Sequence, residues 1–271
     1  MEDIVGTYFG PDARRWLDGR SEPVTGRHGR TLRWGAEVGT SFDRNGVRES
    51  MITYEWGPDM MDAFPDPLYR LARTAIDALP GLRPAYTSIR CGRSSGSQQV
   101  TFAIDAPLSL SALRPLMDAL GLGEQHASLM SAVAFVLGAR FTLPPNSSCL
   151  TLRPTHSGIE LRLDINLELV PDLPPQLMAL LRLQMSERPQ SVRALDSWLM
   201  AMTADGYDWP GTLNVLSACV RPDMPARLAL HIRPAVIESP PDAAPAPGPS
   251  TVVSDSAGAR GARASALAYS R

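Results

Sequence analysis

The stretch GIELRLDINLEL, residues 158–169, alternates apolar side chains with charged or amide side chains. Successive side chains of an extended chain point to opposite faces, so Leu161, Leu163 and Ile165 share one face. The opposite face carries Glu160, Arg162, Asp164 and Asn166. This period of two predicts a strand with one face in the core and one polar face.

The same pattern recurs along the chain as hairpins. Residues 86–105, 148–167 and 212–234 each contain two strand-like runs around a short turn, and residues 32–56 form a weaker copy that turns at Asn45-Gly46. Asn-Gly between two such runs is a strong hairpin signal. The sequence therefore predicts four antiparallel hairpins.

Amphipathic helical patterns lie between the predicted hairpins. Residues 66–81 begin with Asp-Pro, end with Pro-Gly and place Leu68, Leu71 and Ala75 on one face. Further helical patterns cover residues 109–123, 126–138, 174–187 and 189–203. Hairpins that alternate with helices predict a repeated α+β architecture.

The strand alternation also predicts which face of the sheet the helices cover. The apolar residues of 100–104, 161–165 and 228–232 align into one continuous surface, which the helices would bury. The polar face either meets solvent, as in an open antiparallel sheet, or lines the lumen of a closed barrel. Because closure removes exposed sheet edges, we expect an antiparallel β-barrel of repeated hairpins surrounded by helices.

The composition places this barrel in a single domain. We expect the barrel domain to cover residues 31–237, after a partly ordered N-terminal segment at 1–30. Residues 238–271 are rich in Pro, Ala, Gly and Ser and have no periodic apolar face. This composition predicts a disordered tail.

Charge and cysteine content exclude several classes of protein. The net charge is -2 and no basic cluster is interleaved with aromatic residues, so we expect neither nucleic acid nor a membrane as partner. All 26 basic residues are arginines, and the three cysteines show no paired spacing. We expect a cytoplasmic protein without a structural zinc site.

Short segments of the chain resemble the soluble aromatic prenyltransferases, whose αββα barrel holds both substrates in a polar interior. NGVRESMITYEWG, residues 45–57, is similar to the segment of the indole prenyltransferases in which a glutamate accepts the indole N–H. GSQQVTFAID, residues 96–105, and ARLALHIRP, residues 226–234, resemble later strands of that family. The chain departs from the family in having no lysine, few lumen tyrosines and eight predicted strands where ten are common.

The resemblance implies a reaction and a set of residues for it. An allylic, dimethylallyl-type group would move from a diphosphate donor to an indole-like or peptide aromatic acceptor, and Glu49 would be the catalytic acceptor of a proton or hydrogen bond. Arginines suit the leaving diphosphate because they bind phosphate oxygens in pairs. The candidate substrate-binding residues are Arg90, Arg153 and Arg221, which precede three hairpin turns, with Arg162, Arg227 and His231 on the facing strands. No set of metal ligands stands out, so no cofactor is expected to be required and Mg²⁺ is optional.

Two other interpretations fit the same residues. The first is a barrel without catalytic activity that binds a peptide or an anionic small molecule. The second is an unrelated α+β protein whose polar sheet face meets solvent, with the turn arginines at the surface and Asp164 and Glu160 forming ion pairs with Arg162.

Overall fold

One antiparallel sheet organises the chain in the computed structural model, which describes residues 2–25, 36–56, 61–62, 64–186, 189–203 and 211–234. Its strand order is β1-β2-β3-β4-β7-β8-β9-β10. The strands are β1 (Ala36–Asp43), β2 (Gly46–Glu55), β3 (Leu82–Gly92), β4 (Gly96–Ile104), β7 (Ser148–Thr155), β8 (Gly158–Asn166), β9 (Gly211–Arg221) and β10 (Met224–Pro234). The four predicted hairpins are confirmed. The predicted tail at 238–271 lies outside the described residues.

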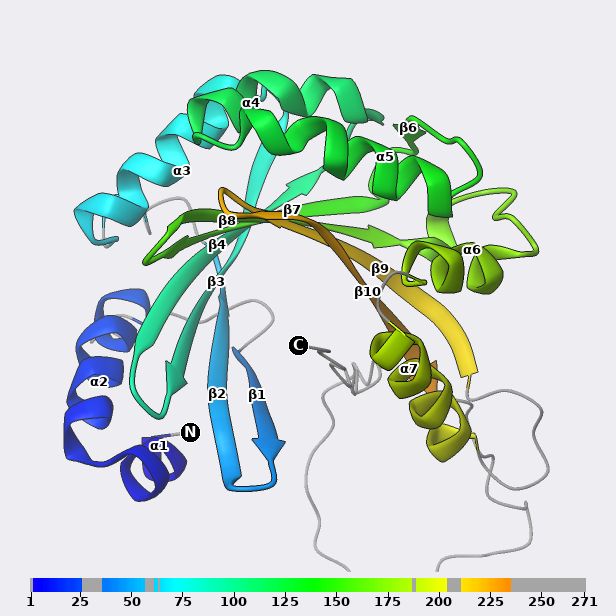
Figure 1. The fold of residues 1–271 in the computed structure, drawn as a ribbon. Coiled ribbons are helices and arrows are strands. Elements are labelled where there is room, and N and C mark those ends of the chain that lie inside the picture. Colours follow the sequence, from blue (N-terminus) through cyan, green and yellow to red (C-terminus); the bar gives the residue numbers. More distant parts are fainter. Residues whose placement is uncertain are drawn as a thin grey trace, which may run out of the picture.

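Helices cover the convex face of the curled sheet (Figure 1). They are α3 (Asp66–Ala78), α4 (Arg114–Ala119), α5 (His126–Val136) and α6 (Leu177–Gln184), with the short helices η2 (Leu110–Leu113), η3 (Gly123–Gln125) and η4 (Leu167–Leu169) and the small sheet β5 (Leu108–Ser109) and β6 (Thr142–Leu143). A last helix, α7 (Pro189–Met202), precedes β9. Among the described residues, no helix has both the length and the apolar character needed to cross a membrane.

The core lies between these helices and the apolar face of the strands. Phe102, Leu163 and Leu216 have no exposed surface, and Leu68 of α3 is also buried. Burying a side chain of this size contributes about 1.5–3 kcal/mol to folding. The predicted orientation of the strands is therefore confirmed: the apolar positions face the helices and the polar positions face the concave side.

The sheet is strongly curled, but its two end strands do not meet. Among the described strands β1 pairs only with β2, and β10 pairs only with β9. Figure 1 shows the β1–β2 and β9–β10 hairpins at opposite ends of an arch. The fold is thus the expected α+β architecture as a half-barrel, and the expectation of full closure is corrected. The convex helices already bury the apolar face, so the alternation is satisfied whether or not the edges pair.

Of the two N-terminal helices, α2 (Pro11–Thr25) packs beside β3 and β4, and α1 (Glu2–Phe9) packs against α2 and contacts β2. Val5 and Leu17 are buried in the same core as the sheet residues. Trp16 lies directly over the turn of the second hairpin, where a Cβ added to Gly96 would stand 2.6 Å from two atoms of the indole ring. The contact of Trp16 with Gly96 is therefore possible only because position 96 lacks a side chain.

We expect Gly96→Ala to destabilise the protein by about 1–3 kcal/mol, because the added methyl group would overlap the ring of Trp16. Gly19→Ala is a matched control, since Gly19 is an exposed residue of α2 with nothing within 4 Å of an added Cβ. Helix propensity predicts a small gain of stability there. Urea unfolding of both variants measures the difference, and equal stability of the two would contradict the proposed packing.

Candidate functional site

The topology gathers the four hairpin turns at one rim of the half-barrel. Every neighbouring pair in the sheet is antiparallel, so β1, β3, β7 and β9 run in the same direction. The turns that follow these strands therefore lie at the same end of the sheet. Arg90, Arg153 and Arg221 precede three of these turns, and their side chains share the concave face with Glu49 and Glu160.

Glu49 and Arg90 form an ion pair between β2 and β3. The Nε atom of Arg90 donates to Glu49 Oε1 at 3.0 Å, and its Nη2 donates to the same oxygen. The side chain of Arg90 is 11% exposed and that of Glu49 is 28% exposed. Glu49 therefore reaches the concave face with one oxygen committed to an arginine.

Glu160 holds two of the predicted arginines at once. Arg153 Nη2 donates to its carboxylate at 2.8 Å from β7, and Arg221 Nε donates at 2.6 Å from β9. Burial alone would raise the pKa of Glu160, but the hydrogen bonds and charges of Arg153 and Arg221 outweigh burial and lower it below the ordinary 4.5. Glu160 is thus an ionised, largely buried carboxylate that carries two guanidinium groups. Among the described contacts, Glu160 therefore pairs with Arg153 and Arg221, whereas the sequence predicted a pairing with Arg162.

A second network connects β8, β9 and β10. Arg162 Nε donates to Asp164 Oδ2 at 3.0 Å, as predicted for this pair. Ser217 Oγ donates to the other oxygen, Oδ1, at 2.5 Å and lies 3.1 Å from His231 Nε2. Burial lowers the pKa of His231, with Asp164 raising it and Arg162 lowering it further. Strand alternation places Ser217 on the polar face, but it gives no indication of the contact with His231.

Arg227 differs from the other candidate arginines because it is exposed. Within the described part of the chain it has no ion-pair partner. It lies in the same cross-strand row as Arg162, with Cys219 between them. Burial raises the pKa of the Cys219 thiol to about 12, so this cysteine is a neutral neighbour of the two guanidinium groups. The described groups of His, Cys, Asp and Glu include no cluster of three that could hold a metal ion.

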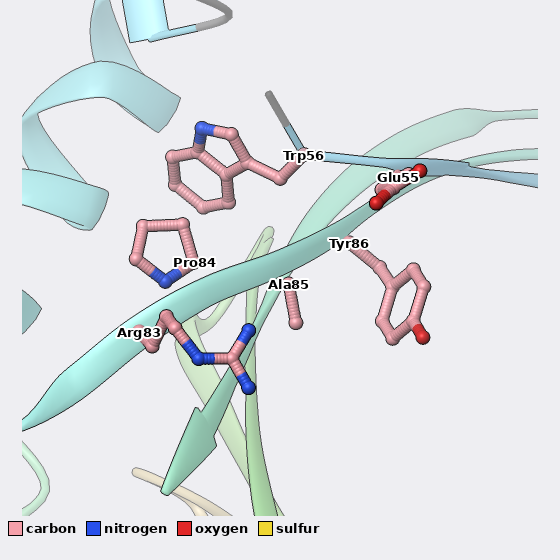
Figure 2. Close-up of a pocket in the computed structure, with 6 residues that line it drawn as sticks. All are labelled: Glu55, Trp56, Arg83, Pro84, Ala85 and Tyr86. Atoms are coloured by element: carbon pink, nitrogen blue, oxygen red, sulfur yellow. The ribbon is translucent and has the colours of Figure 1, made fainter. Parts of the chain in front are cut away.

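A small pocket of about 100 Å³ lies between the end of β2 and the start of β3, near the rim opposite the hairpin turns. Figure 2 shows Trp56 and Tyr86 on opposite sides of β3 in its wall. Sites for small molecules usually enclose about 300–1,000 Å³. None of the candidate residues lines this pocket, so we place the candidate site on the concave face instead.

No family model matches the sequence, and no curated protein matches it either. Among solved structures, the chain is similar to the prenyltransferase PriB in a ternary complex with L-tryptophan and dimethylallyl thiolodiphosphate. The TM-score is 0.58 at 14% sequence identity, and the match covers 80% of this chain. The chain spans 64% of the PriB chain. This likeness shows a shared αββα-type fold.

We expect Glu160→Gln to destabilise the protein by roughly 3 kcal/mol at neutral pH, because it removes the charge that Arg153 and Arg221 share. The pKa of Glu160 is lowered in the folded state, so its stabilisation is complete above pH 4.5 and is lost as the pH falls through the folded value. Denaturant unfolding between pH 3 and 7 should therefore show a weaker pH dependence in the variant. Glu124→Gln, at an exposed position, is the control and should match the wild type.

Proposed function

We propose that the protein is an aromatic prenyltransferase, which moves a dimethylallyl-type group from an allylic diphosphate to an indole-like or peptide aromatic acceptor. The fold shared with PriB supports this class of reaction. The observation that carries the proposal is the uneven distribution of charge over the concave face. Among the described residues, Arg153 and Arg221 share the single carboxylate of Glu160, Arg162 lies beside Asp164, and the exposed Arg227 has no carboxylate partner.

This excess of positive charge suits the donor diphosphate. Ionisation of an allylic diphosphate leaves a carbocation and a polyanion, and guanidinium groups stabilise the developing negative charge by paired hydrogen bonds. Glu160 fixes two of these groups in advance, so little reorganisation is needed when the donor binds. Because arginines already supply positive charge for the leaving group, we expect Mg²⁺ to be optional and no other cofactor to be needed.

The acceptor belongs between Glu49 on β2 and the donor on β7–β10, with its polar N–H or O–H toward Glu49 and the attacking ring carbon toward the allylic group. Arg90 orients the Glu49 carboxylate through Oε1. The second oxygen, Oε2, is then available to accept a hydrogen bond from the N–H or O–H of the aromatic acceptor. Such a bond raises the electron density of the ring carbon that attacks the allylic cation.

We expect wild-type protein incubated with dimethylallyl diphosphate and a panel of tryptophan, indole and tyrosine compounds to yield a prenylated product detectable by mass spectrometry. Glu49→Gln removes the negative charge at constant size and should lower kcat/KM by about 100-fold. Glu124→Gln should leave the rate unchanged. Equal rates for Glu49→Gln and wild type would remove Glu49 from the catalytic role.

Arg227 offers a test of the donor site that is independent of turnover. It is exposed, so Arg227→Gln should leave the melting temperature of the free protein unchanged. Loss of one charge-assisted contact should weaken pyrophosphate binding by roughly 10-fold or more, measured by calorimetry. Arg48→Gln, also exposed and outside the site, should bind like wild type.

The same measurements distinguish the alternative function, a barrel that binds an anionic small molecule or a peptide without turning it over. Two observations favour keeping this alternative. Among the described strands, the outer edges of β1 and β10 are unpaired, and the chain spans 64% of the length of PriB. Pyrophosphate binding that depends on Arg227, without any prenylated product from the panel, would select it over the transferase.

A further inference from the structure

Four side chains form a continuous chain of polar contacts from the proposed donor site to the edge strand. Arg162 donates to Asp164, Ser217 donates to Asp164, and Ser217 contacts His231 Nε2 at 3.1 Å. The chain crosses from β8 through β9 to β10. His231 is thereby connected to the arginine cluster, although the neutral ring adds no positive charge to that cluster.

The hydrogen-bond donors available among these four side chains determine the tautomer of His231. An ionised carboxylate only accepts hydrogen bonds, so the single hydroxyl proton of Ser217 points to Asp164. Ser217 can then only accept from the imidazole, which requires the proton of the neutral ring to be on Nε2. Nδ1 therefore carries a lone pair, and no described residue donates a hydrogen bond to it.

The surroundings of His231 keep the ring neutral until a proton arrives. Burial and the positive charge of Arg162 lower its pKa below the ordinary 6.5, and Asp164 only partly opposes them. The other charged groups on β10 are Arg227, which is exposed, and Arg233, which is paired with Glu168 at 2.6 Å. At neutral pH His231 is consequently a base rather than a cation.

Aromatic prenylation releases one proton that some group must take. Glu49 is poorly placed to take it, because protonation would give up the ion pair with Arg90. We propose that His231 Nδ1 accepts the proton that the aromatic carbon loses after the new bond forms, an inference that rests on the proposed function. Asp164 and Ser217 are positioning residues, since they act only through the ring.

The step is balanced without any further reactant. The C–O bond of the allylic diphosphate breaks, and the diphosphate leaves with the bonding pair. Ring π electrons of the acceptor form the new C–C bond. The C–H pair then restores the aromatic ring as the proton passes to Nδ1. The resulting imidazolium is stabilised by the negative charge of Asp164 through Ser217, and it returns the proton to water when the product leaves.

The test is the pH dependence of single-turnover prenylation in wild type, His231→Gln, Ser217→Ala and the control His156→Gln. The wild-type rate should fall as the pH decreases through a value below 6.5, because protonated His231 cannot accept. His231→Gln should lower the rate by about 100-fold or more, and its rate should no longer show this fall at low pH, the acid limb of the profile. Ser217→Ala should keep the limb but shift it to lower pH, since Asp164 no longer supports the imidazolium. His156 lies exposed in a hairpin turn, so His156→Gln should behave like wild type.

The failure of this inference differs from the failure of the proposed function. Absence of product from wild-type protein overturns both. Product formation with an unchanged rate and acid limb in His231→Gln overturns only the role of His231. Nitrogen-15 NMR of the wild-type imidazole at pH 7 gives a second check that needs no variant: the proton should be on Nε2, and a proton on Nδ1 would overturn the inference.

Discussion

The fold depends on burying one face of a curled sheet against helices on its convex side. Apart from the edge strand β1, whose Val38 and Phe42 are exposed, the strands pack apolar side chains into a core that includes Phe102 and Leu163, both without exposed surface. Once the helices occupy that side, the polar side chains of these strands must turn to the concave side. Curvature then crowds these polar side chains together, so charged groups that would be solvated on a flat sheet come into contact.

Crowding explains why the candidate arginines carry carboxylate partners. A guanidinium group that loses part of its hydration is costly unless an opposite charge replaces the water. Glu49 meets this need for Arg90, Asp164 for Arg162, and Glu160 for Arg153 and Arg221 together. Because two arginines share the single carboxylate of Glu160, β7–β10 carry an excess of positive charge, and we place the donor there.

Sequence periodicity predicted what depends on local structure and missed what depends on contacts between hairpins. The four hairpins, their turns and the orientation of the strands follow from alternation and turn residues such as Asn45-Gly46, because these signals lie within about 20 residues of one another. Closure of the barrel could not be predicted, since alternation specifies which face is buried and not whether the edges pair. The sharing of Glu160 and the contact of Ser217 with His231 depend on the register between β8, β9 and β10, which no short-range signal determines.

The unpaired ends of the arch have a consequence for the range of molecules that the concave face can accommodate. In a closed barrel, ladder hydrogen bonds fix the circumference, and the internal diameter follows from strand number and stagger. Among the described strands no such ladder joins β1 to β10, so the spacing between the two end hairpins depends on the curl of the sheet and on the helices packed against it. Small changes in the curl of the sheet can widen or narrow that spacing without breaking a backbone hydrogen bond. The width of the concave face is therefore adjustable in the open topology in a way that a closed barrel does not allow.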